Sequence, residues 1–93
     1  MNKAELIEKV ARETGQSKAV TREVLDNFID AVGRTLASGN KIEIRGFGSF
    51  RIKRRKAQVA RNPRTGAKVE VPSRFVPSFK PSRILLEQVD KKK

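Results

Sequence analysis

The chain contains no cysteine, histidine, tryptophan or tyrosine, and its only aromatic residues are five phenylalanines. It therefore forms no disulfide bond and offers no thiol nucleophile, no imidazole base and neither of the usual zinc-binding side chains. Catalysis would depend on carboxylates and lysines, yet Glu43, Glu70 and Asp90 show no spacing that pairs them on one face. We expect a protein that is not an enzyme and uses no metal or cofactor.

Long apolar segments are also missing. The longest uninterrupted apolar run is Ile84–Leu86, whereas a membrane-spanning helix needs about 20 such residues and a signal peptide about 7 to 15. The basic residues follow a strand pattern and do not lie opposite an apolar helical face, which argues against a role at a membrane surface. We expect a soluble, cytoplasmic chain.

Positive charge is abundant and unevenly distributed. The 93 residues include 22 Lys or Arg and 10 Asp or Glu, a net charge of +12, and nearly all of the excess lies after residue 50. Residues 51–74 hold nine basic side chains and one acid, Glu70. Such a run can be an ordinary solvated face, but a field of one sign this large repels itself and favours a polyanionic partner.

The first forty residues predict two helices. Asn2 and Glu5 have the spacing of a capping box, and apolar residues then recur at helical intervals. The first helix is predicted over residues 3–13, with Gly15 ending it.

The second helix is predicted to begin after Ser17, which can cap it, and to end at Gly39 and Asn40. It carries a long, wide apolar stripe with spacings of three and four residues. The members of this stripe are Val20, Val24, Leu25, Phe28, Ile29, Val32 and Leu36.

From residue 41 the apolar period changes to two, which predicts two half-buried strands. Ile42 and Ile44 alternate with charged residues in the first, and Phe50 and Ile52 do so in the second. The intervening Gly46–Gly48 favours a tight hairpin. Its glycines do not match a nucleotide-binding motif, because neither GxGxxG nor a following Lys-Ser/Thr is present.

A β-hairpin arm is predicted next. Residues 53–61 resemble one extended basic strand, residues 67–71 its partner, and Arg61–Gly66 the turn between them. Nine residues at ~3.3 Å each give an arm about 30 Å long. Its apolar side offers only Ala and Val, and an isolated two-stranded ribbon is marginally stable in water. We expect the arm to be mobile until a partner holds it.

Prolines punctuate the segment that follows the arm. Pro72, Pro77 and Pro81 are expected to break it into extended pieces, with returns to the body at Val76 and Phe79. Either Pro81 or Ser82 can open a short last helix through Ile84, Leu85 and Val89. Lys91–Lys93 is expected to be a frayed solubilising end.

The size of the body predicts a dimer. About seventy residues remain outside the arm, and a single core of that size rarely supplies more than ~3–5 kcal/mol. One short helix and a small sheet do not cover the apolar surface, whereas two copies could share a core. The expected shared core is Val24, Leu25, Phe28, Ile29, Val32, Leu36, Phe47, Phe50 and Phe79.

Three motifs together carry a resemblance to a known family. Gly46–Phe50, Arg61–Gly66 and Val76–Pro81 resemble, in order and spacing, segments of the bacterial histone-like HU proteins and of integration host factor. The resemblance implies an α+β fold and an intertwined dimer, with a helical body over a small antiparallel sheet and two protruding β-ribbon arms. The chain departs from the family pattern at Gln58, Ala60, Phe75 and Ser82, and Phe75 could add an apolar contact at the arm base or with DNA.

The implied organisation is one HU-type domain over residues 1–93. Residues 1–40 would form the helical dimerisation region, and residues 41–80 the sheet, with the DNA-binding arm at about 53–76. Residues 81–93 would form the C-terminal helix and basic tail.

The implied function is architectural binding of double-stranded DNA in the nucleoid, largely independent of sequence. By the same resemblance, basic arms would grip the minor groove, and Pro63 would insert between base pairs and kink the duplex, as is typical of this family. The DNA-binding residues would be Lys3, Lys53, Arg54, Arg55, Lys56, Arg61, Asn62, Pro63, Arg64, Lys68, Arg74, Lys80 and Arg83.

Two alternatives stay open. The chain could be one subunit of a sequence-specific heterodimer like integration host factor, which requires a second chain and one preferred site. Less favoured is a small ribosomal or RNA-binding protein, because RNA-binding modules present exposed aromatics for stacking. Here Phe47, Phe50 and Phe79 occupy positions that suit a core.

Overall fold

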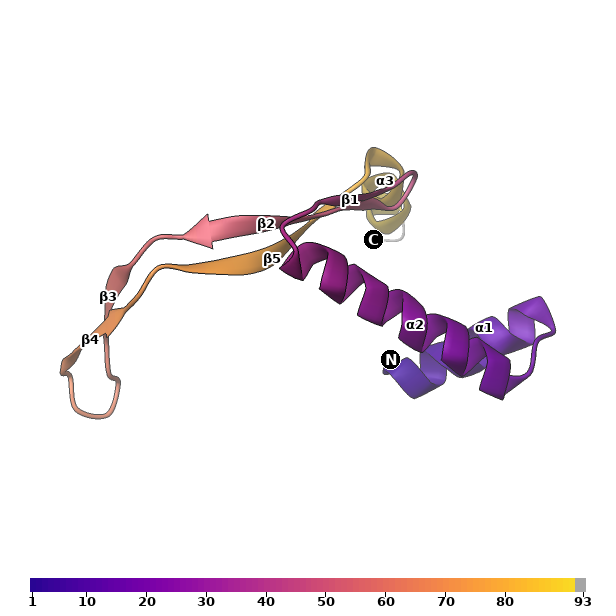
Figure 1. Cartoon of the computed structure of the whole chain (residues 1–93), viewed down its shortest axis with the longest axis horizontal. Coiled ribbons are helices and arrows are strands. Elements are labelled where there is room, and N and C mark those ends of the chain that lie inside the picture. The colour runs from indigo at the N-terminus through magenta and orange to yellow at the C-terminus, as the bar shows by residue number, and fades with distance from the viewer. Residues whose placement is uncertain (92–93) are drawn as a thin grey trace. The chain divides into compact units, whose positions relative to one another are not determined.

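The computed structural model describes residues 1–91, which form two compact units, Met1–Thr35 and a second unit that begins at Leu36. Helices and strands are labelled in chain order in Figure 1. The elements are α1 (Lys3–Thr14), α2 (Lys18–Ala37), β1 (Ile42–Ile44), β2 (Gly48–Arg55), β3 (Gln58–Arg61), β4 (Lys68–Val71), β5 (Arg74–Pro81) and α3 (Arg83–Lys91).

Helix α1 has the predicted caps at both ends. The Asn2 side-chain oxygen accepts a hydrogen bond from the backbone N–H of Glu5 at 2.9 Å, satisfying one of the free donors of the first turn. At the other end Gly15 adopts a left-handed conformation with φ 74° and donates its N–H to the carbonyl of Ala11. The predicted helix is confirmed, and it extends one residue further.

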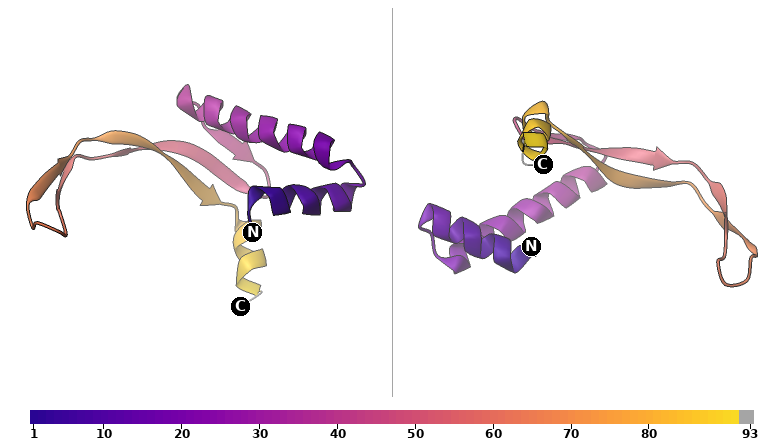
Figure 2. Two further views of the ribbon diagram at one scale, coloured as in Figure 1. Left: turned by 90° about the horizontal axis from the view of Figure 1, so that it is seen from below. Right: turned by 180° about the vertical axis from the view of Figure 1, so that it is seen from behind.

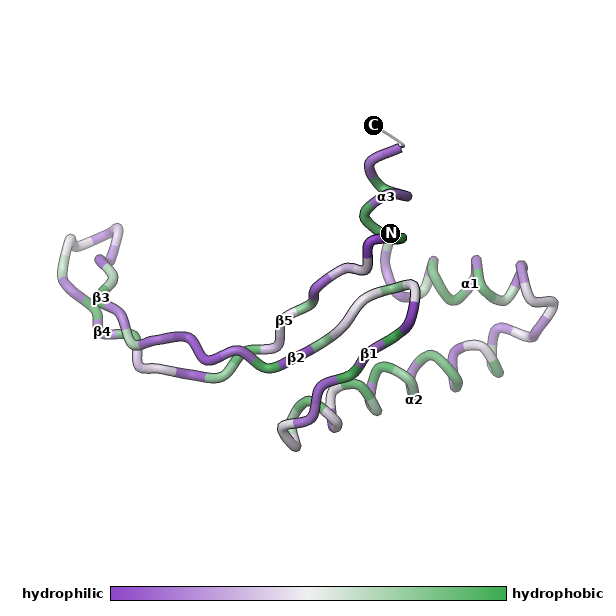
Figure 3. Tube along the Cα trace, turned by 90° about the horizontal axis from the view of Figure 1, so that it is seen from above, coloured by the Kyte–Doolittle hydropathy of each residue, from purple (hydrophilic) through white to green (hydrophobic). Residues whose placement is uncertain are grey.

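Helix α2 is also delimited as predicted. Ser17 Oγ accepts a hydrogen bond from the N–H of Val20 at 3.1 Å, and Gly39, with φ 89°, donates to the carbonyl of Leu36 at 2.9 Å. Figure 3 shows hydrophobic residues recurring along the whole helix.

Few apolar side chains are buried within the described chain. Only Ile7, Ala11 and Leu36 form the buried apolar set of residues 1–91. The stripe of α2 stays largely open, with Val24 62% and Phe28 51% exposed. Apolar surface of this extent favours a partner surface that covers it.

The second unit contains a three-stranded antiparallel sheet in the order β1–β2–β5. The hairpin between β1 and β2 closes through the N–H of Phe47, which donates to the carbonyl of Ile44 at 3.0 Å. Gly46 adopts φ 83°, a conformation that favours glycine. The predicted hairpin is thus confirmed.

Strand β5 contradicts one prediction, since Pro77 does not break the chain, whereas β5 ends at Pro81 as expected. Pro77 lies within the continuous strand Arg74–Pro81, where it faces Ile52 of β2. The reason is position: β5 is at the edge of the sheet, and an edge strand tolerates a residue without an N–H donor.

The arm is a two-stranded ribbon that is interrupted on both sides; the break at Pro72 was predicted, and the one opposite it was not. Residues 53–61 do not form one strand, because β2 ends at Arg55 and β3 begins at Gln58. The opposite chain is interrupted at residues 72 and 73, between β4 and β5. Pro72 cannot donate a ladder hydrogen bond, which accounts for the gap. Figures 1 and 2 show the ribbon changing direction between its two ladders.

The last helix begins after Ser82, as predicted. Ser82 Oγ accepts a hydrogen bond from the N–H of Leu85 at 3.0 Å, and α3 runs to Lys91. The rest of the predicted basic tail, residues 92 and 93, lies outside the described residues. Within residues 1–91, no helix combines the length and apolar character needed to cross a membrane.

Candidate nucleic-acid interface

The sheet has one apolar face and one cationic face. The ladder pairs Phe50 with Phe79 and Ile52 with Pro77. Because side chains alternate along a strand, these four lie on one face. The other face receives Arg51, Lys53 and Arg55 from β2, and Arg74, Val76, Ser78 and Lys80 from β5.

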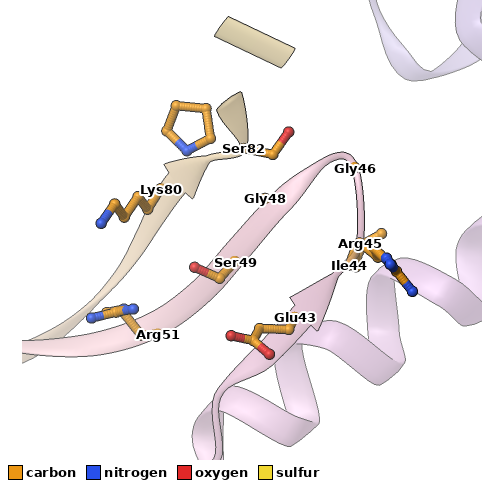
Figure 4. A pocket seen from close by; sticks show the side chains of 10 residues that line it. Glu43, Ile44, Arg45, Gly46, Gly48, Ser49, Arg51, Lys80 and Ser82 are labelled. Atoms are coloured by element: carbon orange, nitrogen blue, oxygen red, sulfur yellow. The ribbon is translucent and has the colours of Figure 1, made fainter. Parts of the chain in front are cut away.

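Two arginines, one in the turn between β1 and β2 and one on β2, were missing from the residues predicted to bind DNA. Arg45 and Arg51, together with Lys80, line a hollow of about 560 Å³ over β1, β2 and β5; Figure 4 shows their side chains around it. Glu43 also lines this hollow, and its carboxylate lies 3.7 Å from the amine of Lys41. The signal for Arg51 was its spacing, since it is two residues before Lys53 and therefore shares its face.

Cations face one another at both ends of the ribbon. Arg55 of β2 lies directly opposite Arg74 of β5 in the ladder, and Arg61 of β3 lies opposite Lys68 of β4. Like charges directly opposite one another destabilise an antiparallel pair. The predicted residues Lys53, Arg54 and Lys56 are adjacent to the first of these pairs in sequence and are exposed.

Acidic side chains of the described residues do not neutralise these cations. Every ion pair recorded within residues 1–91 lies outside residues 51–74. The single acid of that segment, Glu70, faces Val59 across the β3–β4 ladder. The ribbon therefore carries uncompensated positive charge, which a row of phosphates would neutralise.

The tip of the ribbon is a turn organised by Asn62. Its backbone N–H donates to the carbonyl of Ala67 at 2.9 Å, and its own carbonyl accepts from Gly66 at 2.7 Å. Its side-chain oxygen also accepts from the N–H of Arg64 at 2.9 Å. These bonds hold the turn without using Pro63, which is exposed and free to contact a ligand.

The remaining predicted residues, Lys3, Lys80 and Arg83, belong to other elements than the turn at the tip. Lys80 is near the end of β5 and Arg83 is the first residue of α3. Lys3, at the start of α1, is already paired, because its Nζ lies 2.8 Å from Oδ1 of Asp26. Both partners of this ion pair are about half exposed, so its net stabilisation is small.

The phenylalanines of the sheet form a cluster. The ring of Phe79 lies 4.8 Å from that of Phe50 and 5.2 Å from that of Phe47, centroid to centroid. Phe47 is nevertheless 44% and Phe79 39% exposed. These rings pack on one another, and they leave apolar surface that a second protein surface can cover.

Comparison with solved structures supports the fold assignment. The chain superposes on an Anabaena HU protein from a cocrystal structure with DNA, with a TM-score of 0.90 and 37% identity, covering 96% of this chain and 97% of that one. HU from Thermotoga maritima gives a TM-score of 0.70 with 34% identity, covering 96% and 98% of the two chains.

Sequence comparisons point to the same group. Integration host factor subunit beta of Burkholderia cenocepacia (strain HI2424) is 46% identical over 91 residues, covering 97% of this chain and 85% of the relative. The Shewanella sp. (strain ANA-3) protein of the same name is 46% identical, covering 97% and 96%. The family model described as bacterial DNA-binding protein matches residues 1–90. The chain therefore belongs to the bacterial DNA-binding protein family that includes HU and integration host factor.

Proposed function

We propose that this chain binds double-stranded DNA with its cationic ribbon and bends it at Pro63, with little dependence on base sequence. Members of its family are architectural DNA-binding proteins that form dimers, and they are not enzymes. The finer assignment rests on one observation: the ribbon places arginines opposite Arg74 and Lys68, and no acid among residues 1–91 pairs with them.

The arrangement of cations predicts how the complex responds to salt. Each phosphate that a Lys or Arg neutralises releases condensed counterions, and the slope of log K against log salt is about −0.9 per phosphate. The proposed contacts are those predicted from the sequence, extended by Arg45 of the β1–β2 turn and Arg51 of β2. Such contacts position the protein without reading bases, which supports a role in organising the bulk of the nucleoid DNA.

The turn at the tip predicts the role of Pro63. An apolar ring inserted between base pairs unstacks them and kinks the duplex. Because the bonds of Asn62 hold the turn without the proline, Pro63→Ala should preserve the tip. We expect this variant to retain salt-dependent binding and to bend DNA much less.

Bending can be measured by energy transfer between dyes at the two ends of a short duplex. Pro77→Ala provides the matched control, since it makes the same chemical change at an exposed proline of the edge strand β5, outside the tip. If the end-to-end distance of the duplex at saturating protein is the same with Pro63→Ala as with the unaltered protein, Pro63 does not kink the DNA by inserting between base pairs.

The second candidate is one subunit of a site-specific heterodimer. The observation that favours it is the 46% identity to integration host factor beta subunits. If the first function holds, the purified chain alone should form a homodimer by sedimentation and bind random and defined duplexes with similar affinity. A monomer that requires a second chain, together with strong preference for one sequence, would instead support the heterodimer.

An RNA-binding role is less well supported. The rings of Phe47, Phe50 and Phe79 pack together, so three of the four phenylalanines of the second unit do not present the open rings on which successive bases stack. Competition between duplex DNA and duplex RNA at equal salt distinguishes the two functions.

A further inference from the structure

One phenylalanine differs from the others in its surroundings. Phe75 is 73% exposed, more than any other phenylalanine of the chain. It lies near the start of β5, directly opposite Arg54 of β2. By alternation it shares the face of Ile52 and Pro77, but it lies further out along the ribbon than the cluster formed by Phe47, Phe50 and Phe79.

The neighbourhood of Phe75 is cationic and hollowed. Arg54, Lys56, Ala57 and Ser73 line a hollow of about 490 Å³. Arg54 is the ladder partner of Phe75 and therefore lies on the same face of the ribbon. Ser73 belongs to the interruption between β4 and β5, two residues before Phe75. No recorded ion pair within the described chain involves any of these residues.

The surroundings of Phe75 distinguish between the kinds of partner that could cover its ring. A second protein surface covering the ring would also have to cover Arg54, its unneutralised ladder partner, and burying an unpaired charge is costly. A nucleic acid instead brings a phosphate for each cation and a flat base for the ring. Cationic grooves with open aromatic rings are how proteins bind unpaired nucleotides, because every base has a face that can stack.

We propose that Phe75 is a stacking platform for an unpaired nucleobase beside a duplex. The proposal rests on the proposed function, in which the ribbon holds the duplex itself. Bases within an intact duplex stack on one another and leave no face for the ring. Phe75 therefore strengthens binding only where the duplex is interrupted, at a gap in DNA or a bulge in RNA.

The test compares two duplexes of equal length, one intact and one with a two-nucleotide gap, at equal salt. Phe75→Ala should weaken binding to the gapped duplex about tenfold, the effect expected from removing one stacked base, and leave the intact duplex within about twofold. Phe75→Leu keeps an apolar side chain without a ring and should behave like alanine. Phe75→Tyr should restore the preference. Val59→Ala, at another exposed apolar position of the ribbon, should change neither affinity.

A second readout locates the base directly. A 5-iodouracil opposite the gap should crosslink on irradiation to the peptide that contains Phe75, and this crosslink should be lost in Phe75→Leu. The same comparison with a duplex RNA carrying a two-nucleotide bulge distinguishes the two sources of an unpaired base. If Phe75→Ala abolishes the preference for the gapped DNA, the bulged RNA or both, the result supports the stacking platform and shows which nucleic acid supplies the unpaired base.

Three results overturn the proposal. If Phe75→Ala weakens binding to the gapped and the intact duplex equally, Phe75 is an ordinary duplex contact. Phe75→Leu that keeps the gap preference excludes stacking. A dimer that dissociates at assay concentration in Phe75→Ala places the ring in the protein interface. Failure of the proposed function is distinct, since it appears as weak, salt-insensitive binding of the unaltered chain to the intact duplex.

Discussion

Replacing Arg55 and Arg74 together by glutamine should have opposite effects on the free protein and on its complex with DNA. The two arginines lie directly opposite each other in the β2–β5 ladder, and neither belongs to an ion pair of residues 1–91. Their repulsion destabilises the free ribbon, whereas their charge attracts phosphate. The double variant separates these two consequences of one arrangement.

The magnitudes follow from the register. Removing one like-charged cross-strand pair should stabilise each free ribbon by up to about 1 kcal/mol. In a dimer the variant lacks four cations, which lowers the salt slope by up to about 3.6 if each neutralises one phosphate. When salt rises from about 50 to 200 mM, the affinity of the unaltered protein for DNA should fall by a factor that is up to about 150 times larger than the factor for the variant.

Hydrogen exchange of the free protein and titrations of a random duplex at several salt concentrations measure the two effects. We expect greater protection of amides in β2 and β5 and a shallower slope. Arg12→Gln with Arg34→Gln is the matched control, because it removes the same charge from arginines paired with Glu8 and Asp30. That control should leave the slope unchanged. The reasoning is refuted if Arg55→Gln with Arg74→Gln leaves the slope unchanged, or if the control lowers it equally.

Two further predictions concern the body of the protein. Gly48→Ala should lower the free energy of unfolding, measured by chemical denaturation, by about 1–3 kcal/mol, because the added Cβ would lie 2.5 Å from the Lys80 carbonyl oxygen and 2.7 Å from the Phe79 ring. The control Gly33→Ala should not lower it, because a Cβ there meets no atom within 4 Å. Equal stability of the two variants would contradict the close approach at Gly48. Val24→Asp should dissociate or unfold the dimer in sedimentation experiments at micromolar concentration, because it places a charge in the apolar stripe of α2. The control Asn27→Asp, also on α2, should remain dimeric. A stable Val24→Asp dimer would contradict the prediction that this stripe forms part of the shared core.

Local chemistry was predictable from the sequence. Asn2, Ser17 and Ser82 each cap a helix through the side-chain oxygen, as their positions predicted. Gly15 and Gly39 end helices in the left-handed region. These features depend on neighbouring residues along the chain, so periodicity and capping rules were sufficient to locate them.

The ladders were less predictable because a strand depends on its partner. Pro77 was expected to end a strand, but it lies within β5 because the order β1–β2–β5 leaves that strand at the edge. Residues 53–61 were expected to be one strand, and the gap opposite Pro72 divides them. Neither sheet order nor cross-strand register is encoded locally in the chain.

The sequence alone determined the net charge, the helices with their caps, the turn around Pro63 and the apolar stripe of α2, since each depends on residue type or spacing. Only the tertiary structure decided which cations face one another, that Lys80 joins the face of Arg51 and Lys53, and that Phe75 stays open beside Arg54 while three other rings pack together. The physical reason is that charge repulsion and ring packing are interactions between strands, and the register of the folded ladder sets their distances.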